Sequence, residues 1–294
     1  MATYKTYDTI GIREDLQDAI YDISPTTTPF MSTVGRTKAK ATYHEWQTDS
    51  LADVNLDNAQ LEGADAVAAV LTPTTRVGNY TQISDKVIQV STTDDVVDKA
   101  GRSTETAYQL SKASAEIKRD MESILLSDQA QSAGTSTTAR KLGGLASWIT
   151  TNTVDTAGGA LTEEMLKEAV LKAYTAGGEP DVLLVSPANK QVVSTFAGIA
   201  EQRYQAPKSS ATTIIGAADV YLSDFGSVSV VPDRFLSDDY SFVLDPSMAS
   251  VAYLRPFKSQ KLAKMGDSEK HLLNVEYTLR VNNEAAHAMM SDES

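Results

Sequence analysis

Residues 101–128 read GRSTETAYQLSKASAEIKRDMESILLSD and carry the clearest helical pattern in the chain. Spacings of three and four residues trace a mostly apolar line through Leu110, Ser114, Ile117, Met121, Ile124 and Asp128. Ser103 is a suitable N-cap, and Glu105 falls in the first turn, where a negative charge stabilises a helix. About 25 residues at 1.5 Å each give a rod of about 38 Å. This helix is long for a globular protein.

An extended segment with isolated aromatic residues precedes the helix. Residues 25–51 read PTTTPFMSTVGRTKAKATYHEWQTDSL, without a helical stripe or a long strand pattern. Pro25 and Pro29 prevent a helix from continuing through this region. Phe30 and Trp46 are large apolar side chains that an isolated arm cannot bury. We therefore expect an arm over residues 1–36 whose aromatic anchors dock elsewhere.

A long acidic loop lies between two predicted strands, residues 38–46 and 74–93. It exceeds twenty residues and shows no fold of its own, which inside a compact domain usually marks a functional loop. Asp53, Asn55 and Asp57 resemble the first places of a calcium loop. However, Asn58 replaces the required Gly, and Ala64 stands where a bidentate Glu is needed. The segment is therefore interpreted as an exposed acidic loop.

Alternating helices and strands follow the long helix. A helix is predicted from its cap at Thr162 to about Ala176, with Gly177 as terminator. DVLLVS at 181–186 predicts a buried strand, and a second helix begins at Ser186-Pro187. A hairpin is expected over 218–233, two short strands over 241–255 and a long alternating strand over 271–283. This part of the chain is therefore expected to form a compact α/β unit, and the fold class of the whole chain, with its separate arm, hairpin and long helix, is expected to be α+β.

Composition and motifs exclude several functions. The 294-residue chain has a net charge of −13, which argues against general nucleic-acid affinity, and it has no Cys. No apolar run reaches transmembrane length, and no signal peptide is evident. His44, His271 and His287 lack metal-ligand spacing. Asp224–Gly226 reads DFG, but without the other kinase motifs it indicates a hairpin turn. We expect no enzyme activity, no cofactor and no metal site.

Several stretches, in order along nearly the whole chain, resemble the major capsid (head) proteins of tailed bacteriophages with the Hong Kong 97-like fold. They are ISPTTTPFMSTVG (23–35), HEWQTDSL (44–51), LEGADA (61–66), AEIKRDMESILL (115–126), GGEPDVLLVSPANKQVVSTFAG (177–198) and VNNEAAHAMM (281–290). The resemblance implies five parts. These are an N-terminal arm at 1–36, an E-loop hairpin with flanking strands at 37–93, a spine helix and P-domain at 94–155, an A-domain at 156–245, and a return segment with a long C-terminal strand at 246–294.

The resemblance also implies a function, a location and partners. The protein is expected to self-assemble, in hexamers and pentamers, into the icosahedral head shell that encloses double-stranded DNA without reading its sequence. It would be assembled in the host cytoplasm and reside in the virion capsid, with no membrane contact. Portal, scaffold and decoration proteins are the expected partners. Only about 36 residues precede the hairpin, so the scaffold is expected to be a separate chain.

Specific intersubunit contacts follow from the charges and aromatic anchors. The loop acids Asp49, Asp53, Asp57, Glu62 and Asp65 have no Lys or Arg among them, so they need an outside partner. The segment RPFKSQKLAK offers Arg255, Lys258, Lys261 and Lys264. We predict that loop and strip meet between subunits, and that Phe30 and Trp46 also contact a neighbour. The alternative is that both charged surfaces are simply solvated.

Two other functions are open at this stage. An encapsulin-like nanocompartment shell would share the fold, although the long arm disfavours it, and packaged enzyme cargo would support it. A carboxylate-dependent hydrolase would need a deep pocket with two converging acids of shifted pKa. These alternatives differ in what the structure must contain.

Overall fold

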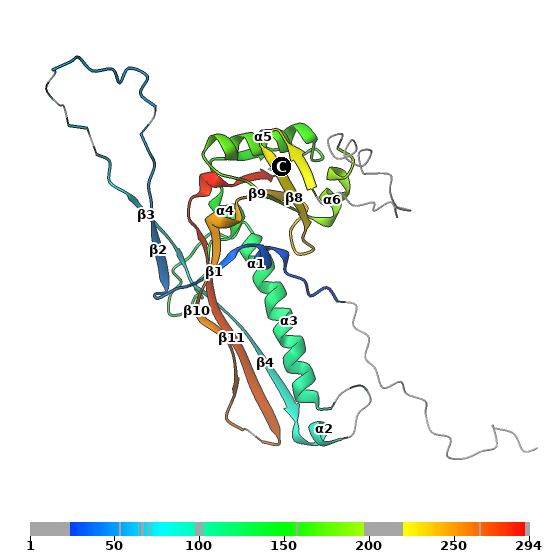
Figure 1. The fold of residues 1–294 in the computed structure, drawn as a ribbon. Coiled ribbons are helices and arrows are strands. Elements are labelled where there is room, and N and C mark those ends of the chain that lie inside the picture. Colours follow the sequence, from blue (N-terminus) through cyan, green and yellow to red (C-terminus); the bar gives the residue numbers. More distant parts are fainter. Residues whose placement is uncertain are drawn as a thin grey trace, which may run out of the picture.

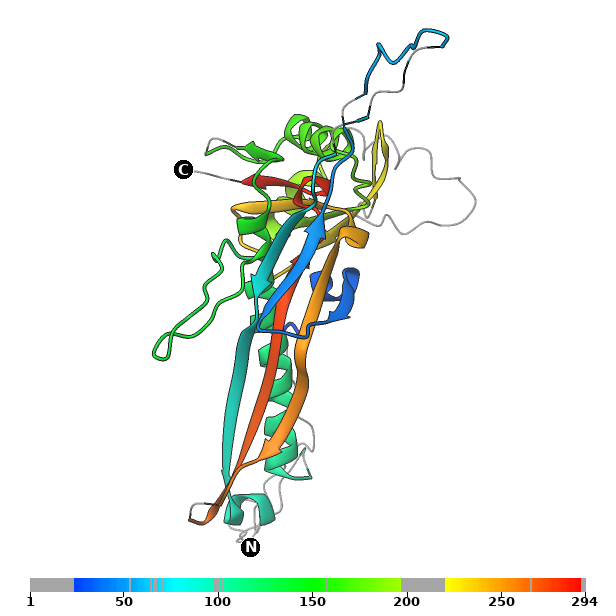
Figure 2. The ribbon, with the colours of Figure 1, turned by 90° about the vertical axis from the view of Figure 1, so that its left-hand side faces the viewer.

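The computed structural model describes residues 24–52, 54–63, 65, 68–69, 71–97, 101, 103–156, 158–196, 220–264 and 266–291. These residues form an elongated molecule (Figure 1). An α/β unit occupies one end, and a long sheet backed by one helix extends from it. A loop projects away from both parts (Figures 1 and 2). The described part of the molecule is therefore elongated, and its loop projects from the body (Figure 1).

The long helix α3 spans Glu105–Leu126. Its N-cap is Thr104, whose Oγ1 accepts the Ala107 N–H at 3.4 Å, so the prediction of Ser103 as the cap was wrong by one residue. At the other end, the Ser127 hydroxyl donates to the Ile124 carbonyl at 2.8 Å. The 22 residues make a rod of about 33 Å.

The long sheet has the strand order β1-β10-β11-β4. Its strands are β1 (Gly35–Lys38), β4 (Gln82–Ser91), β10 (Ala249–Lys261) and β11 (Ser268–Val281). Alternate residues of β11, among them Val275 and Tyr277, are buried in one cluster with Ile117 and Met121 of α3. The face of the sheet that carries the intervening residues therefore points away from α3. Its exposed part, around Ile83–Val87 of β4, is called the open face below.

β10 is longer than the sequence predicts. Only short strands were expected over residues 241–255, but β10 runs on to Lys261. Pro256 interrupts the pattern because it has no N–H to donate. The register with β11 shifts between Tyr253 and Arg255 and again between Arg255 and Lys258, so the proline lies in an irregular part of the pairing.

The upper α/β unit is built on a second sheet with the order β5-β12-β9-β6-β8-β7. Its strands are β5 (Thr153–Asp155), β6 (Val182–Val185), β7 (Val220–Ser223), β8 (Gly226–Pro232), β9 (Tyr240–Leu244) and β12 (Ala288–Ser291). Helix α5 (Glu163–Thr175) packs on it through Leu166, Ala169 and Val170. Helix α6 is Pro187–Val193. The predicted Thr162 cap and the turn at Asp224 and Phe225 are both confirmed.

The projecting hairpin is formed by β2 (Tyr43–Thr48) and β3 (Thr75–Tyr80), which pair antiparallel. The loop that joins them is the segment that leaves the body of the molecule (Figure 1). Among the described residues, the remaining short elements are α2 (Thr92–Val96), α4 (Leu145–Trp148) and the 3₁₀ turns η2 (Pro246–Met248) and η3 (Glu284–Ala286). No helix in the described ranges is long and apolar enough to cross a membrane.

The described part of the N-terminal arm is not simply extended. Residues Pro29–Thr33 form a short helix, α1, with Pro29 at a first-turn position. Phe30 and Met31 are buried in the same cluster as Met121 of α3 and Phe242 of β9. Phe30 is 0% exposed. The reasoning that a neighbouring subunit must cover Phe30 was therefore wrong, because its own subunit does so.

Candidate functional site

The loop between β2 and β3 exposes large aliphatic side chains to solvent. Every described residue from Asp49 to Arg76 is exposed. Leu51 is 97% exposed, Leu56 92% and Leu61 84%. Scattered exposed leucines are ordinary, but several on one projecting loop form an apolar surface that the subunit itself cannot cover. Sequence reasoning identified the acids of this loop and missed its leucines, since they follow no strand or helix period.

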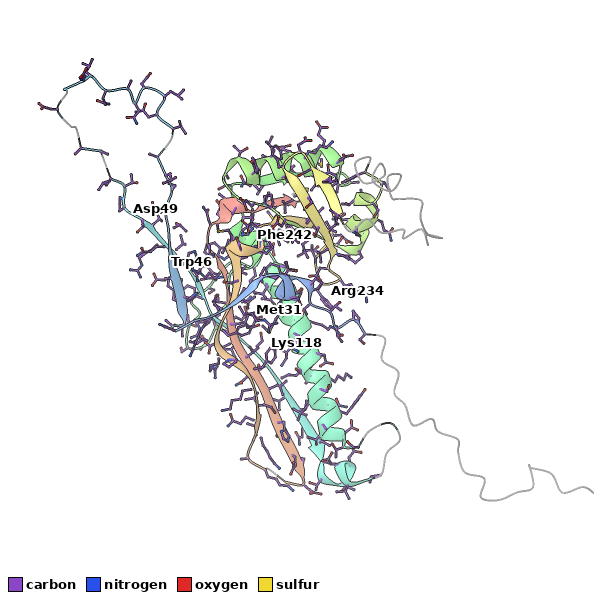
Figure 3. All side chains as sticks on the ribbon, viewed as in Figure 1. Met31, Trp46, Asp49, Lys118, Arg234 and Phe242 are labelled. Carbon is purple, nitrogen blue, oxygen red and sulfur yellow. The ribbon has the colours of Figure 1, made fainter. Side chains whose placement is uncertain are left out.

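The acids of the loop share this exposed segment. Asp49, Asp57, Glu62 and Asp65 are all exposed, while Asp53 lies outside the described residues. Asp49 stands at the base of the loop (Figure 3). Asp57 donates its N–H to Asn55 Oδ1 at 2.9 Å, a local turn. The loop therefore presents a mixed surface of leucines and carboxylates.

The root of the loop is held by buried aromatic packing. Trp46 is 6% exposed, and its ring lies 5.5 Å from that of Trp148. Trp46 therefore also packs within its own subunit, contrary to the argument that a neighbour must cover it. Arg76 and Glu45 form an ion pair of 2.6 Å at the same root. A packed root gives the exposed loop a defined starting direction.

Asn79 fastens this root to the body. It is 0% exposed, and its Nδ2 donates to the carbonyls of Gly143 at 3.0 Å and Leu279 at 2.9 Å. Its Oδ1 accepts the Gly143 N–H at 2.8 Å. One side chain thus joins β3, β11 and the segment before α4. The sequence offered no signal for this role, since Asn79 lies in an ordinary strand pattern.

Glu276 is a second buried anchor. Its Oε1 accepts from Thr81 Oγ1 at 2.9 Å and from the Arg140 guanidinium at 2.7 Å. Its Oε2 accepts from Arg255 Nε at 2.7 Å. The side chain of Glu276 is only 5% exposed. These contacts tie the end of the loop hairpin to both β10 and β11.

The predicted basic strip on β10 is partly neutralised within the subunit. Arg255 is engaged by Glu276, Lys261 pairs with Glu269 at 2.6 Å, and Lys264 lies 3.9 Å from Asp267. Lys258 is exposed and forms no ion pair with any described residue. Of the four predicted cations, Lys258 is therefore the one most available to an outside partner.

Loop and strip lie far apart in one subunit. The loop extends from the upper end of the molecule, whereas the turn between β10 and β11 lies at the opposite end (Figures 1 and 2). The structure therefore does not bring the predicted acids and bases together in a single chain. Any meeting between them requires a second copy.

The hydrolase alternative finds no support in the hollows of the surface. The acid with the largest upward pKa shift, Glu122, is fully buried and accepts backbone N–H groups from α1. A hollow of about 240 Å³ nearby is lined by two acids, Asp128 and Asp239, but by neither Glu122 nor Asp233. The two buried acids whose pKa is raised therefore do not face this hollow. Within the described ranges, no group of three or more His, Asp or Glu is arranged to hold a metal.

Comparisons with known proteins identify the class. A solved chain from Gordonia phage Cozz superposes with a TM-score of 0.66, covering 97% of this chain and 92% of that one at 11% identity. A chain of the holo-SrpI encapsulin complex from Synechococcus elongatus PCC 7942 gives 0.62, covering 99% and 96% at 15% identity. These likenesses show the fold alone, and it is the Hong Kong 97-like fold of phage capsid proteins.

Sequence similarity separates the phage protein from the encapsulin. The family described as SU10 major capsid protein matches residues 2–294. The major capsid protein of Escherichia phage Phieco32 is 30% identical over 340 residues, covering 98% of this chain and 96% of that protein. The chain belongs to the SU10 major capsid protein family. It is a phage capsid protein that self-assembles into the virion shell, and its family is structural rather than enzymatic.

Proposed function

We propose that this subunit joins its shell by laying the projecting loop, residues 49–74, on the open face of the long sheet of a neighbouring copy. The observation that carries the proposal is the near-complete exposure of Leu51, Leu56 and Leu61 on a loop that reaches beyond its own subunit. Burying such side chains on a partner would contribute about 1.5–3 kcal/mol each. That energy is available only in the assembled state.

The open face has apolar residues that suit these leucines. Ile83 and Val87 of β4 are 49% and 52% exposed. Val87 is paired with Leu272 of β11, and paired residues of neighbouring strands share a face. Leu273, the next residue of β11, is buried toward α3, so Leu272 and Val87 point the other way.

The same face has a cation that suits the loop acids. Lys258 is paired with Asn274, which is paired in turn with Asp85 of β4. Lys258 therefore shares the face of Asp85, two residues along β4 from both Ile83 and Val87. Apolar groups, the cation Lys258 and the acid Asp85 therefore occur together on this face. The apolar match with the loop leucines is the main support for docking there, and Lys258 supplies one cation for the loop acids.

The wider role follows from the capsid family. The shell would be icosahedral, built from hexamers and pentamers, and would enclose double-stranded DNA without reading its sequence. A net charge of −13 suits a wall that surrounds DNA without adhering to it. Portal, scaffold and decoration proteins, and assembly in the host cytoplasm, belong to this proposal. The proposal also includes the division of the chain into N-terminal arm (1–36), E-loop hairpin (37–93), spine helix and P-domain (94–155), A-domain (156–245) and return segment (246–294).

The test replaces Leu51, Leu56 and Leu61 together by Ser and measures assembly by sedimentation. These side chains contact little of their own subunit, so the variant should unfold at the same temperature as the parent. It should remain mostly unassembled where the parent forms shells. Leu171→Ser on α5, a half-exposed leucine away from the loop, serves as a control that should assemble normally. Normal assembly of the triple variant would contradict the proposal.

A further inference from the structure

Two carboxyl groups are buried at the junction between α3, the upper unit and the N-terminal arm. Glu122 projects from α3, and Asp233 directly follows β8. Both residues are 0% exposed, and their side chains interact with each other. Neither contributes to the docking surface described above, so the pair requires a separate explanation.

Glu122 holds the arm. Its Oε1 accepts the Phe30 N–H at 2.5 Å, and its Oε2 accepts the Met31 N–H at 3.0 Å. These are first-turn N–H groups of α1, which have no partner within the helix. Glu122 is thus the acceptor that completes the short helix α1 from 92 residues away in the sequence.

Asp233 belongs to the upper unit. Its N–H donates to the Val185 carbonyl of β6 at 2.8 Å, and its Oδ1 accepts the Phe235 N–H at 2.8 Å. Its Oδ2 is buried and meets no donor among the described residues. One carboxylate oxygen of this side chain is therefore available to share a proton with Glu122.

The charges that face the pair do not neutralise it. Tyr253 of β10 interacts with Glu122, and Arg36 of β1 acts on Tyr253. Arg119 of α3 places its guanidinium 5.5 Å from the centre of the Phe235 ring. Neither carboxyl forms an ion pair with any Lys or Arg of the described residues, α1 has no ionisable side chain, and Arg234 is exposed. Two adjacent buried negative charges without a cation are strongly unfavourable.

The turn after Asp233 has space to move. A hollow of about 240 Å³ separates the end of α3, at Ser123 and Ser127, from the turn at Phe235–Tyr240. Close packing would otherwise resist any shift of this turn. The junction therefore combines a polar contact that depends on protonation with neighbouring free volume.

We propose that one proton shared by Glu122 and Asp233 fastens the turn at residues 233–239 to α3, and that losing this proton in alkali loosens the junction between the upper unit and the long helix. Glu122, once ionised, would still hold the N–H groups of α1. The turn at residues 233–239 is therefore the part that separates.

The direction of the pH effect follows from the pair. Burial first, and then the charge of Asp233, raise the pKa of Glu122 to about 8, and burial also raises the pKa of Asp233. Between about pH 4.5 and pH 8, Glu122 therefore holds a proton in the folded chain but has lost it in the unfolded chain. Stability is present below the unfolded pKa, near 4.5 for Glu, and declines as the pH rises through about 8.

The experiment uses the unassembled full chain, so that its outcome is independent of loop docking. Thermal unfolding is measured from pH 5 to pH 9 for the parent, Asp233→Asn and Asp238→Asn. In Asp233→Asn the amide can donate to an ionised Glu122 and still accept the Phe235 N–H. Its unfolding temperature should therefore fall less between pH 5 and pH 9, by roughly 5 °C or more. Asp238 is exposed on the same turn, and its variant should follow the parent.

A second measurement keeps the proposal testable if Asp233→Asn folds poorly. Infrared difference spectra of the parent should show the C=O band of a protonated carboxylic acid at pH 7 that disappears by about pH 9. Asp238→Asn should retain this band. The proposal is overturned if the parent has no protonated carboxyl at pH 7, or if Asp233→Asn loses stability in alkali as steeply as the parent.

Discussion

Arg255 Nε lies 2.7 Å from Glu276 Oε2 on the adjacent strand of the same subunit, and Arg140 contacts the other oxygen of that carboxylate at 2.7 Å. A cation that the sequence assigned to an intersubunit surface is thus engaged within the subunit. The buried carboxylate has its charge balanced, and the end of the loop hairpin is fixed through Thr81. The rigidity of the loop root therefore depends on Glu276.

Glu276→Gln should destabilise the folded subunit. The amide keeps the shape of the side chain but leaves two guanidinium groups without their counter-charge. We expect a loss of about 2–4 kcal/mol in the free energy of unfolding, measured by denaturant titration. Glu269→Gln breaks the exposed pair with Lys261 and should change the free energy of unfolding little, because solvent screens that pair. Equal effects of the two variants would contradict the role assigned to Glu276.

Gly144 should tolerate no side chain. An added Cβ would lie 2.2 Å from the Ser127 carbonyl oxygen and 2.9 Å from that of Ile124. Gly144→Ala would therefore push the segment before α4 away from the end of α3. We expect a loss of about 3 kcal/mol or a failure to fold. The control is Gly35→Ala, whose Cβ would approach no atom closer than 3.7 Å and should change stability little.

His287 should make the subunit sensitive to acid. It is fully buried, its Nδ1 accepts the Asp245 N–H at 3.2 Å, and burial lowers its pKa to about 4. Between about pH 4 and pH 6.5, His287 therefore binds a proton in the unfolded chain but not in the folded chain. Stability is lost as the pH falls from about 6.5 to 4, by at most roughly 3 kcal/mol. His287→Gln should reduce this slope in denaturant titrations, and an unchanged slope would contradict the role assigned to His287.

The electrostatic part of loop docking should depend on salt. Changing Lys258, Lys261 and Lys264 together to Glu should slow assembly at low ionic strength, where charges act over about 10 Å or more. The defect should shrink relative to the parent as salt is added. Because two of these lysines already have partners, Lys258→Glu alone should account for most of the effect. Light scattering follows assembly. A triple variant that assembles like the parent at low salt would contradict a role for these lysines in loop docking.

Local patterns predicted the regular elements well. The apolar stripe of α3 and the Thr162 cap of α5 depend on residue spacing and side-chain chemistry within a few residues. Both could therefore be predicted from the local sequence. The strands around residues 182–185 and 220–232 were likewise found from runs of apolar and β-branched residues. The overall α+β arrangement was then supported by resemblance to a known family.

Features that depend on distant residues were not predictable. Helix α1 has five residues and would not be stable alone; Glu122 and the surrounding core complete it. The same distance hides the roles of Asn79 and Glu276, whose partners are far away in the sequence. The apolar part of the docking surface was also not predictable. The sequence shows the charges of the loop acids directly, whereas the exposure of Leu51 and Leu56 is known only once the chain is folded.

The most direct test of loop docking is a structure of the assembled shell at side-chain resolution. If the loop docks as proposed, Leu51, Leu56 and Leu61 will lie within about 4.5 Å of the open face of a neighbouring copy, near Ile83 and Val87. The loop acids should lie within about 10 Å of that neighbour's Lys258. Leucines that remain in solvent, or that fold back on their own subunit, would contradict it.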